Sequence, residues 1–283
     1  MASRTRQKEK AATLLSLHTG GKLLVLPNVW DPLGARILQT KGFPAIATAS
    51  AAISASLGFK DGERIKLASM IEAIGRIARS VDVPVTADIE AGYATTVSEL
   101  EDTIRAVIDA GVVGINLEDA IEDGRALRSM EDQCARIAVV RDFAARQDVH
   151  LVINARTDCY HVPSAVAGAG DATEEAVARA AAYAKAGADC IYPLGPGDEA
   201  TVKILRARIA APINILMTPT AAPLPVLESI GVNRVSFGPY VHRTLTKHFV
   251  DIADAVMKER DASVIKGMLT KDQMAEYLLD GPE

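Results

Sequence analysis

The sequence is poor in aromatic residues and in cysteine. Phe, Trp and Tyr together make up 4% of its 283 residues, and it has three cysteines, Cys134, Cys159 and Cys190. An odd number of widely spaced cysteines argues against a disulfide framework and against a clustered zinc site. Reduced thiols in a cytoplasmic protein are the simplest interpretation.

Long apolar runs and an excess of basic residues are also absent. No apolar run reaches the length of a membrane span. The first ten residues are basic, but no signal-peptide core follows them. We expect residues 1–20 to form a helix closing one end of the fold, with a transit peptide as the alternative. The formal net charge of −5 argues against a nucleic-acid partner, and we expect no membrane partner either.

The glycine-rich turn of a dinucleotide-binding fold is missing as well, because Asn28-Val29-Trp30-Asp31 stands after the first apolar strand. Short apolar strands and helices alternate instead, and a glycine ends several of the helices, as in Ala110-Gly111-Val112. This pattern predicts an α/β fold, a single (β/α)8 TIM barrel over residues 1–283 with a helical extension at 261–283. The expected strands are 23–30, 45–50, 83–90, 114–119, 150–158, 190–195, 212–219 and 234–238.

Acidic residues stand at the predicted carboxyl ends of neighbouring strands, where such barrels carry their active sites. Asp88 and Glu90 share one strand face, and Glu118 ends the next strand. These carboxylates would repel one another unless a divalent cation such as Mg²⁺ joined them. Arg156, at the end of the fifth strand, has a planar guanidinium group that can donate two hydrogen bonds to a substrate carboxylate. The alternative is that each acid caps a helix or pairs with a basic residue.

Other polar residues near this end of the barrel have more than one interpretation. Thr48 and Ser50 end the second strand and could bind a substrate carboxylate or cap a helix or turn. Asp61, taken alone, is typical of a turn residue. Three residues in the loops of the same rim could supply a proton, although each is more often a packing or surface residue: Tyr93, Tyr160 and His161.

Five segments together resemble the isocitrate lyase/phosphoenolpyruvate mutase superfamily over nearly the whole barrel. They are Leu26 to Asp31, Thr48 to Asp61, Asp88-Ile89-Glu90-Ala91-Gly92-Tyr93, Asn116-Leu117-Glu118-Asp119 and Asn154-Ala155-Arg156-Thr157.

The resemblance implies that Asp88, Glu90 and Glu118 hold Mg²⁺, with Mn²⁺ as an alternative, and that Asp61 lies close to the metal site. It also implies that Arg156 binds substrate and stabilises an enolate. Substrate-binding roles follow by the same resemblance for Thr48, Ser50 and Asn214. Superfamily members typically form homotetramers or homodimers in which the terminal helix is swapped onto a neighbouring barrel.

One loop departs from the superfamily pattern. The true lyases carry Lys-x-Cys-Gly-His after the fourth strand, but residues 120–127 here contain neither Cys nor His. The Lys-Thr pattern of the phosphonate enzymes is absent too. The sequence therefore resembles the branch that lacks the catalytic Cys loop motif.

These features predict a Mg²⁺-dependent carbon–carbon lyase or decarboxylase. Its substrate would be a small 2-oxo or 2-hydroxy carboxylic acid, and the reaction would pass through an enolate. Two alternatives remain. One is a phosphonate P–C bond mutase or hydrolase, and the other is a non-catalytic carboxylate-binding barrel.

Overall fold

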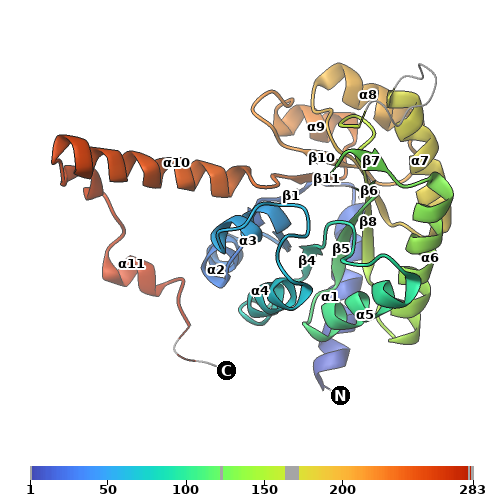
Figure 1. Ribbon diagram of the computed structural model, residues 1–283, viewed down its shortest axis with the longest axis horizontal. Coiled ribbons are helices and arrows are strands. Elements are labelled where there is room, and N and C mark those ends of the chain that lie inside the picture. Colours follow the sequence, from blue (N-terminus) through green and yellow to red (C-terminus); the bar gives the residue numbers. More distant parts are fainter. Residues whose placement is uncertain (1, 122–123, 163–171, 280, 282–283) are drawn as a thin grey trace.

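The computed structural model describes residues 2–121, 124–162, 172–279 and 281. Eight consecutive segments of parallel strand form a closed barrel in it (Figure 1). One sheet runs in the order β2-β3-β4-β5-β8-β9 and another in the order β1-β11-β10. A bridge between Ile191 and Ile213 joins the two sheets on one side, and on the other side the chain runs from β1 directly into β2. The barrel strands are β1 (Leu24–Leu26) with β2 (Asn28–Val29), β3 (Ile46–Thr48), β4 (Val85–Asp88), β5 (Gly114–Glu118), β8 (Val152–Thr157), β9 (Cys190–Pro193), β10 (Asn214–Leu216) and β11 (Arg234–Ser236).

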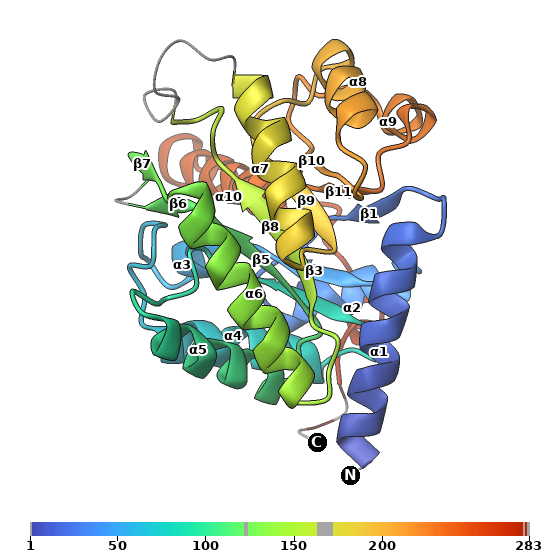
Figure 2. The same cartoon turned by 90° about the vertical axis from the view of Figure 1, so that its right-hand side faces the viewer.

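The strands are buried on both faces, as a parallel sheet covered by helices requires. Every residue of β3 is buried, and Ile115 and Leu117 of β5 are fully enclosed. All eight strands lie within the segments expected from the sequence, so the barrel prediction is confirmed. Helices cover the outside of the barrel (Figure 2): α2 (Pro32–Thr40), α3 (Ser50–Ser56), α4 (Leu67–Arg79), α5 (Val97–Asp109), α6 (Met130–Arg146), α7 (Ala172–Ala186), α8 (Glu199–Arg208) and α9 (Leu224–Ile230).

The first helix, α1 (Ala2–Thr19), packs against the amino-terminal ends of the strands. A Cβ built on Gly114 would lie 2.6 Å from Leu14 Cδ2 and 2.9 Å from Thr86 Oγ1. Gln7 Nε2 donates to the carbonyl oxygens of Ile108 and Val112 at 2.7 and 3.0 Å. The first helix therefore packs across the amino-terminal end of the barrel.

The last long helix, α10 (Tyr240–Asp254), extends away from the barrel (Figure 1). None of its residues is buried, and Leu245 and Phe249 are 53% and 71% exposed. Three short helices follow, η2 (Ala255–Glu259), η3 (Ser263–Ile265) and α11 (Lys271–Ala275). The tail then returns to the barrel, where Arg36 Nε donates to the Tyr277 carbonyl at 2.7 Å. Among the described residues, no helix has both the length and the apolar character needed to cross a bilayer.

His18, near the end of α1, makes the stability of the fold depend on pH. The ring is 1% exposed, and its Nδ1 lies 2.8 Å from the Leu14 carbonyl oxygen. Burial, and then the charge of Arg234, lowers the pKa of His18 to about 4, whereas an unfolded histidine has a pKa of about 6.5. The unfolded chain therefore binds this proton first as the pH falls, and stability is lost between those two values.

We expect the free energy of unfolding to be about 2 kcal/mol smaller at pH 5 than at pH 7 because of this residue. The measurement is urea unfolding across that range for the wild type and for His18→Gln. The variant should lose this part of the pH dependence while keeping the part due to other groups. Identical pH profiles for the two proteins would contradict the assignment.

Candidate active site

A cavity of about 420 Å³ lies at the carboxyl ends of β4, β5 and β8. Its described lining contains several carboxylates but one basic residue, Arg156. Asp88 lies directly behind the lining and contacts Ser50. The acidic lining residues are Asp61, Glu63, Glu90, Glu118 and Asp158.

Asp88, the last residue of β4, is fixed by its neighbours on β3 and α3. Its Oδ2 accepts hydrogen bonds from the Ser50 hydroxyl at 2.8 Å and from the Ser50 backbone N–H at 3.2 Å. Its own N–H donates to Thr48 Oγ1 at 3.1 Å. The other carboxylate oxygen, Oδ1, is buried without a hydrogen-bond partner among the described residues. Such an oxygen is held in place and can accept a cation or a water molecule.

Glu90 lies just past the end of β4 in a left-handed conformation with φ of 53°. Its Oε2 accepts from the Glu63 N–H at 2.6 Å, and its Oε1 accepts from the Tyr93 hydroxyl at 3.2 Å. Burial, followed by the charges of Asp61 and Asp88, raises the pKa of Glu90 to about 8. The site therefore holds more negative charge than it neutralises.

The turn around Glu90 stores backbone strain. Glu63 and Tyr93 also have positive φ values, 57° and 52°. The Tyr93 N–H donates to Glu63 Oε1 at 2.7 Å, which links all three residues. Non-glycine residues in this region cost of order 1–3 kcal/mol each and occur preferentially at functional sites. The strain therefore supports a functional role for this rim.

Arg156 is held between two acids. Its Nη1 lies 2.6 Å from Glu118 Oε2. Its Nε and Nη2 donate to the two oxygens of Asp158 at 2.8 and 2.6 Å. Burial raises the pKa of Glu118; Arg156 opposes this shift, and the charges of Asp158, Asp88 and Glu90 add to it. One arginine does not neutralise the acids around it, so the cavity favours a cation.

The spacing of these acids bears on how they could hold that cation. Among the residues that the structure describes, no three His, Cys, Asp or Glu side chains converge closely enough to ligate one ion directly. Mg²⁺ is commonly bound through one or two carboxylates while it keeps several waters. The open oxygen of Asp88 and the surplus negative charge fit an ion held in that way.

The structure separates the predicted substrate-binding residues. Ser50 lines the cavity and Asp61 stands exposed at its mouth. Thr48 is buried behind Asp88, and its hydroxyl accepts from the Asp88 backbone instead of facing the cavity. Asn214 lies inside the barrel, where its Nδ2 donates to Ser236 Oγ at 3.0 Å. Thr48 and Asn214 are therefore not part of the described lining.

Of the three rim residues considered as proton donors, Tyr93 contacts a site acid, Glu90. The Tyr160 hydroxyl donates to Thr173 Oγ1 at 3.2 Å. His161 Nδ1 lies 3.2 Å from the Leu194 carbonyl oxygen. None of the three residues, Tyr93 included, is part of the described lining of the cavity, and Tyr93 reaches the site through its contact with Glu90.

The loop that departs from the superfamily pattern borders the cavity. Strands β6 (Ala120–Ile121) and β7 (Ala126–Leu127) pair as an antiparallel hairpin, and Ala120, Ile121 and Gly124 line the cavity. Residues 122 and 123 lie outside the described part of the chain. The preceding Asp119 is fully buried and accepts from Arg179 at 3.0 Å and from the Tyr183 hydroxyl at 2.7 Å. This network anchors the base of the hairpin.

Three features of the site were not predicted from the sequence. Asp158 lies two residues after Arg156, on the same strand face, but this position alone indicates no role. Glu63 had no local signal, because its contacts depend on the strained turn. Arg234 is fully enclosed in the barrel, where Nη2 donates to Asn116 Oδ1 at 3.3 Å. An arginine at the start of a strand is more often exposed.

Comparisons with known proteins find similar chains, both in sequence and in fold. The family model described as phosphoenolpyruvate phosphomutase matches residues 14–257. The probable 2-methylisocitrate lyase 2 of Corynebacterium glutamicum is 31% identical, over 81% of this chain and 75% of its own. The oxaloacetate decarboxylase of Rhodopseudomonas palustris is 28% identical over 83% of this chain and 80% of its own length. A solved structure from Burkholderia cenocepacia, provisionally named a phosphonomutase, is 37% identical and superposes with a TM-score of 0.79. The match covers 87% of this chain and 98% of that one.

Proposed function

Because the chain belongs to the phosphoenolpyruvate phosphomutase family, within the superfamily that its sequence resembles, we propose that it is a divalent-metal-dependent carbon–carbon lyase or decarboxylase. Its substrate would be a small 2-oxo or 2-hydroxy carboxylic acid that passes through an enolate. The observation that carries this proposal is one cavity with a surplus of carboxylates beside a single fixed arginine. The lyase and decarboxylase among its relatives support it.

Asp88, Glu90 and Glu118 would hold Mg²⁺ or Mn²⁺, partly through water. When bound, the ion supplies Lewis-acid stabilisation of negative charge on the substrate oxygens. Asp88 suits this role because Ser50 fixes one carboxylate oxygen while the other stays unpartnered among the described residues. Burial, followed by the charges of Asp61 and Asp88, raises the pKa of Glu90 to about 8, and a bound cation would offset the part due to those charges.

Arg156 would bind and orient the substrate and stabilise the enolate. Its contacts with Glu118 and Asp158 use three of the five N–H donors of a guanidinium, so two remain for a substrate oxygen. Because the pair of acids fixes its position, the group needs little reorganisation when charge develops. Ser50 lines the same cavity, and its hydroxyl would donate to a substrate carboxylate only by releasing Asp88, which accepts its single proton in this structure.

Tyr93 would hold the proton nearest to the site acids. Its hydroxyl donates to Glu90, and burial together with the Glu90 charge raises the Tyr93 pKa above its usual range. The group therefore stays protonated and can donate, either itself or through a water molecule, to the carbanion carbon of the enolate.

A second candidate function is cleavage or rearrangement of a P–C bond in a phosphonate. It is supported by the family model and by the Burkholderia cenocepacia structure. Assays of purified protein with Mg²⁺ against 2-oxo acids, 2-hydroxy acids and phosphonopyruvate distinguish the two. The lyase proposal expects turnover of a carboxylic acid without phosphorus. Turnover of phosphonopyruvate alone would favour the second function, and ligand-induced stabilisation without any product would favour a binding barrel.

The exposed helix α10 is the basis of an assembly proposal. In a monomer its apolar residues Leu245 and Phe249 face solvent. Exposed apolar patches of this kind commonly mark a surface that another protein covers. We propose that α10 packs on the barrel of a second copy, giving a homodimer or homotetramer. Phe249→Asp should then shift the protein to monomers at micromolar concentration, as measured by size-exclusion chromatography with light scattering. Thr244→Asp, elsewhere on α10, should leave the assembly intact, and a wild-type monomer would contradict the proposal.

A further inference from the structure

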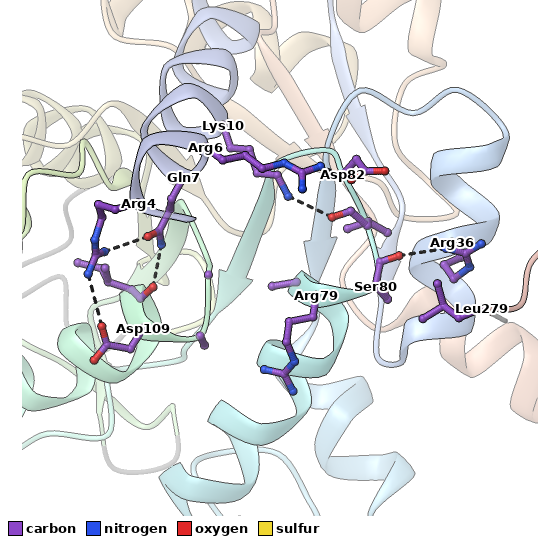
Figure 3. Close-up of a pocket in the computed structure, with 15 residues that line it drawn as sticks. Arg4, Arg6, Gln7, Lys10, Arg36, Arg79, Ser80, Asp82, Asp109 and Leu279 are labelled. Carbon is purple, nitrogen blue, oxygen red and sulfur yellow. Dashed lines mark hydrogen bonds and ion pairs between the residues drawn. The ribbon is translucent and has the colours of Figure 1, made fainter. Parts of the chain in front are cut away.

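A second cavity, of about 480 Å³, lies at the opposite end of the barrel from the candidate active site. It is enclosed by α1, by the carboxyl-terminal ends of α4 and α5, and by the tail residue Leu279 (Figure 3). None of its lining residues is shared with the acidic cavity. It is therefore a separate feature that the proposed reaction does not use.

Basic side chains dominate its lining. Five cationic residues face two acids, Asp82 and Asp109, so the formal charge of the lining is +3 (five minus two). The whole chain has a net charge of −5, so this concentration runs against the overall composition. The five cationic residues are Arg4, Arg6, Lys10, Arg36 and Arg79.

The usual attraction of basic residues to helix ends does not explain this arrangement. Arg36 donates to the Ser80 carbonyl at 3.3 Å and Lys10 donates to the Val81 carbonyl at 3.0 Å, just past the end of α4. However, Arg4 and Arg6 lie at the start of α1, which has no acidic residue in its first turn. The amino-terminal end of a helix carries partial positive charge and disfavours cations. Basic residues at this helix start are unfavourable for the stability of the helix, and such local conflicts occur preferentially at functional sites.

The cations are also incompletely compensated. Arg4 pairs with Asp109 at 3.6 Å and Arg6 pairs with Asp82. Both are ion pairs of exposed or partly exposed side chains, a kind that contributes little stability. For Arg79, at the end of α4, the structure gives no hydrogen bond or ion pair with any described residue, and Figure 3 shows its guanidinium group without a dashed line to the other lining residues. Arg79 is exposed, so its guanidinium group is available to an incoming anion, whereas the other four cations already contact acids or backbone carbonyls.

We propose that this cavity binds a small anion with two or three negative charges, presented by phosphate or carboxylate groups. Its volume falls in the range of small-molecule sites, and guanidinium groups match phosphate and carboxylate oxygens in bidentate geometry. Burial and the neighbouring Arg6 lower the pKa of Lys10, and the charge of Asp82 opposes this shift only in part. A concave site of this size fits a small anion better than an extended polyanion.

Isothermal titration calorimetry with pyrophosphate and with citrate, in a buffer without divalent metal, tests this proposal. The wild type should bind one anion per chain, and affinity should fall as salt is raised. Arg79→Gln should weaken binding about fivefold or more, because it removes a charge-assisted contact. Arg76→Gln, one turn earlier on α4 and outside this cavity, should bind as the wild type does.

A further variant separates this site from the candidate active site. Arg156→Gln removes the arginine of the acidic cavity, so an anion that binds this variant and the wild type equally is bound outside that cavity, and failure of the proposed lyase reaction would not affect this result. A preference for pyrophosphate would assign a phosphorylated ligand, and a preference for citrate a polycarboxylate; either supports the site. Binding of neither anion at about 0.1 M salt, or equal binding by the wild type and Arg79→Gln, would overturn the proposal.

Discussion

Asp88→Asn is expected to lower kcat/KM by about 10³-fold, equivalent to about 4 kcal/mol of transition-state stabilisation. The substitution keeps the shape of the side chain and an oxygen that Ser50 can reach. It removes the negative charge and lets an amide replace the unpartnered carboxylate oxygen. The proposed cation would then lose its most directly available ligand. Steady-state kinetics with the best substrate of the panel measure this effect.

The matched control for this prediction is Asp198→Asn. Asp198 is an exposed cap of α8, where its side chain accepts from the Thr201 N–H at 2.9 Å. Asparagine caps helices about as well as aspartate, so this variant should keep full activity. If Asp88→Asn retained activity within about threefold of the wild type, the role of Asp88 would be wrong.

Arg156→Lys is expected to lower kcat about 10²–10³-fold, although it preserves the charge. Lysine cannot bridge Glu118 and Asp158 as the guanidinium does, because it has a single nitrogen on a flexible stem. The charge would no longer be fixed where the enolate oxygen develops. The effect should therefore be larger on kcat than on KM, as steady-state kinetics would show.

Arg141→Lys provides the control for this second prediction. Arg141 on α6 is also paired with a carboxylate, that of Asp189, and its side chain has the same 21% exposure as that of Arg156. It is not part of the lining of the acidic cavity. A loss of stability but not of kcat is expected. Equal losses of kcat in the two variants would mean that Arg156 acts through general stability alone.

The barrel could be predicted from the sequence because its signals are local. Apolar strands alternate with helices, and glycines such as Gly111 and Gly231 take the left-handed conformation at helix ends. The grouping of Asp88, Glu90 and Glu118 follows from strand order and strand parity, and in the structure Glu90 and Glu118 line one cavity while Asp88 lies behind Ser50 of that lining. Their roles in binding metal stay a prediction.

The residues that the sequence did not indicate depend on long-range contacts. The position of Glu63 follows from a strained turn that pairs it with Glu90 and Tyr93 across the loops. Thr48 occupies the expected strand end, but the backbone of a neighbouring strand uses its hydroxyl. Asp61, taken alone, was typical of a turn, and only the family resemblance indicated its place beside the metal site. No local pattern encodes such contacts.

The central claim is that the acids at the carboxyl ends of β4 and β5 bind a divalent cation. The most direct measurement is the thermal stability of the wild type and Asp88→Asn during titration with Mg²⁺ and Mn²⁺. An ion at 100 times its dissociation constant stabilises the folded state by about 2.7 kcal/mol, which corresponds to a rise in Tm of about 5 °C or more. The account predicts this rise for the wild type and its absence in Asp88→Asn. No rise with either ion, or the same rise in both proteins, would contradict it.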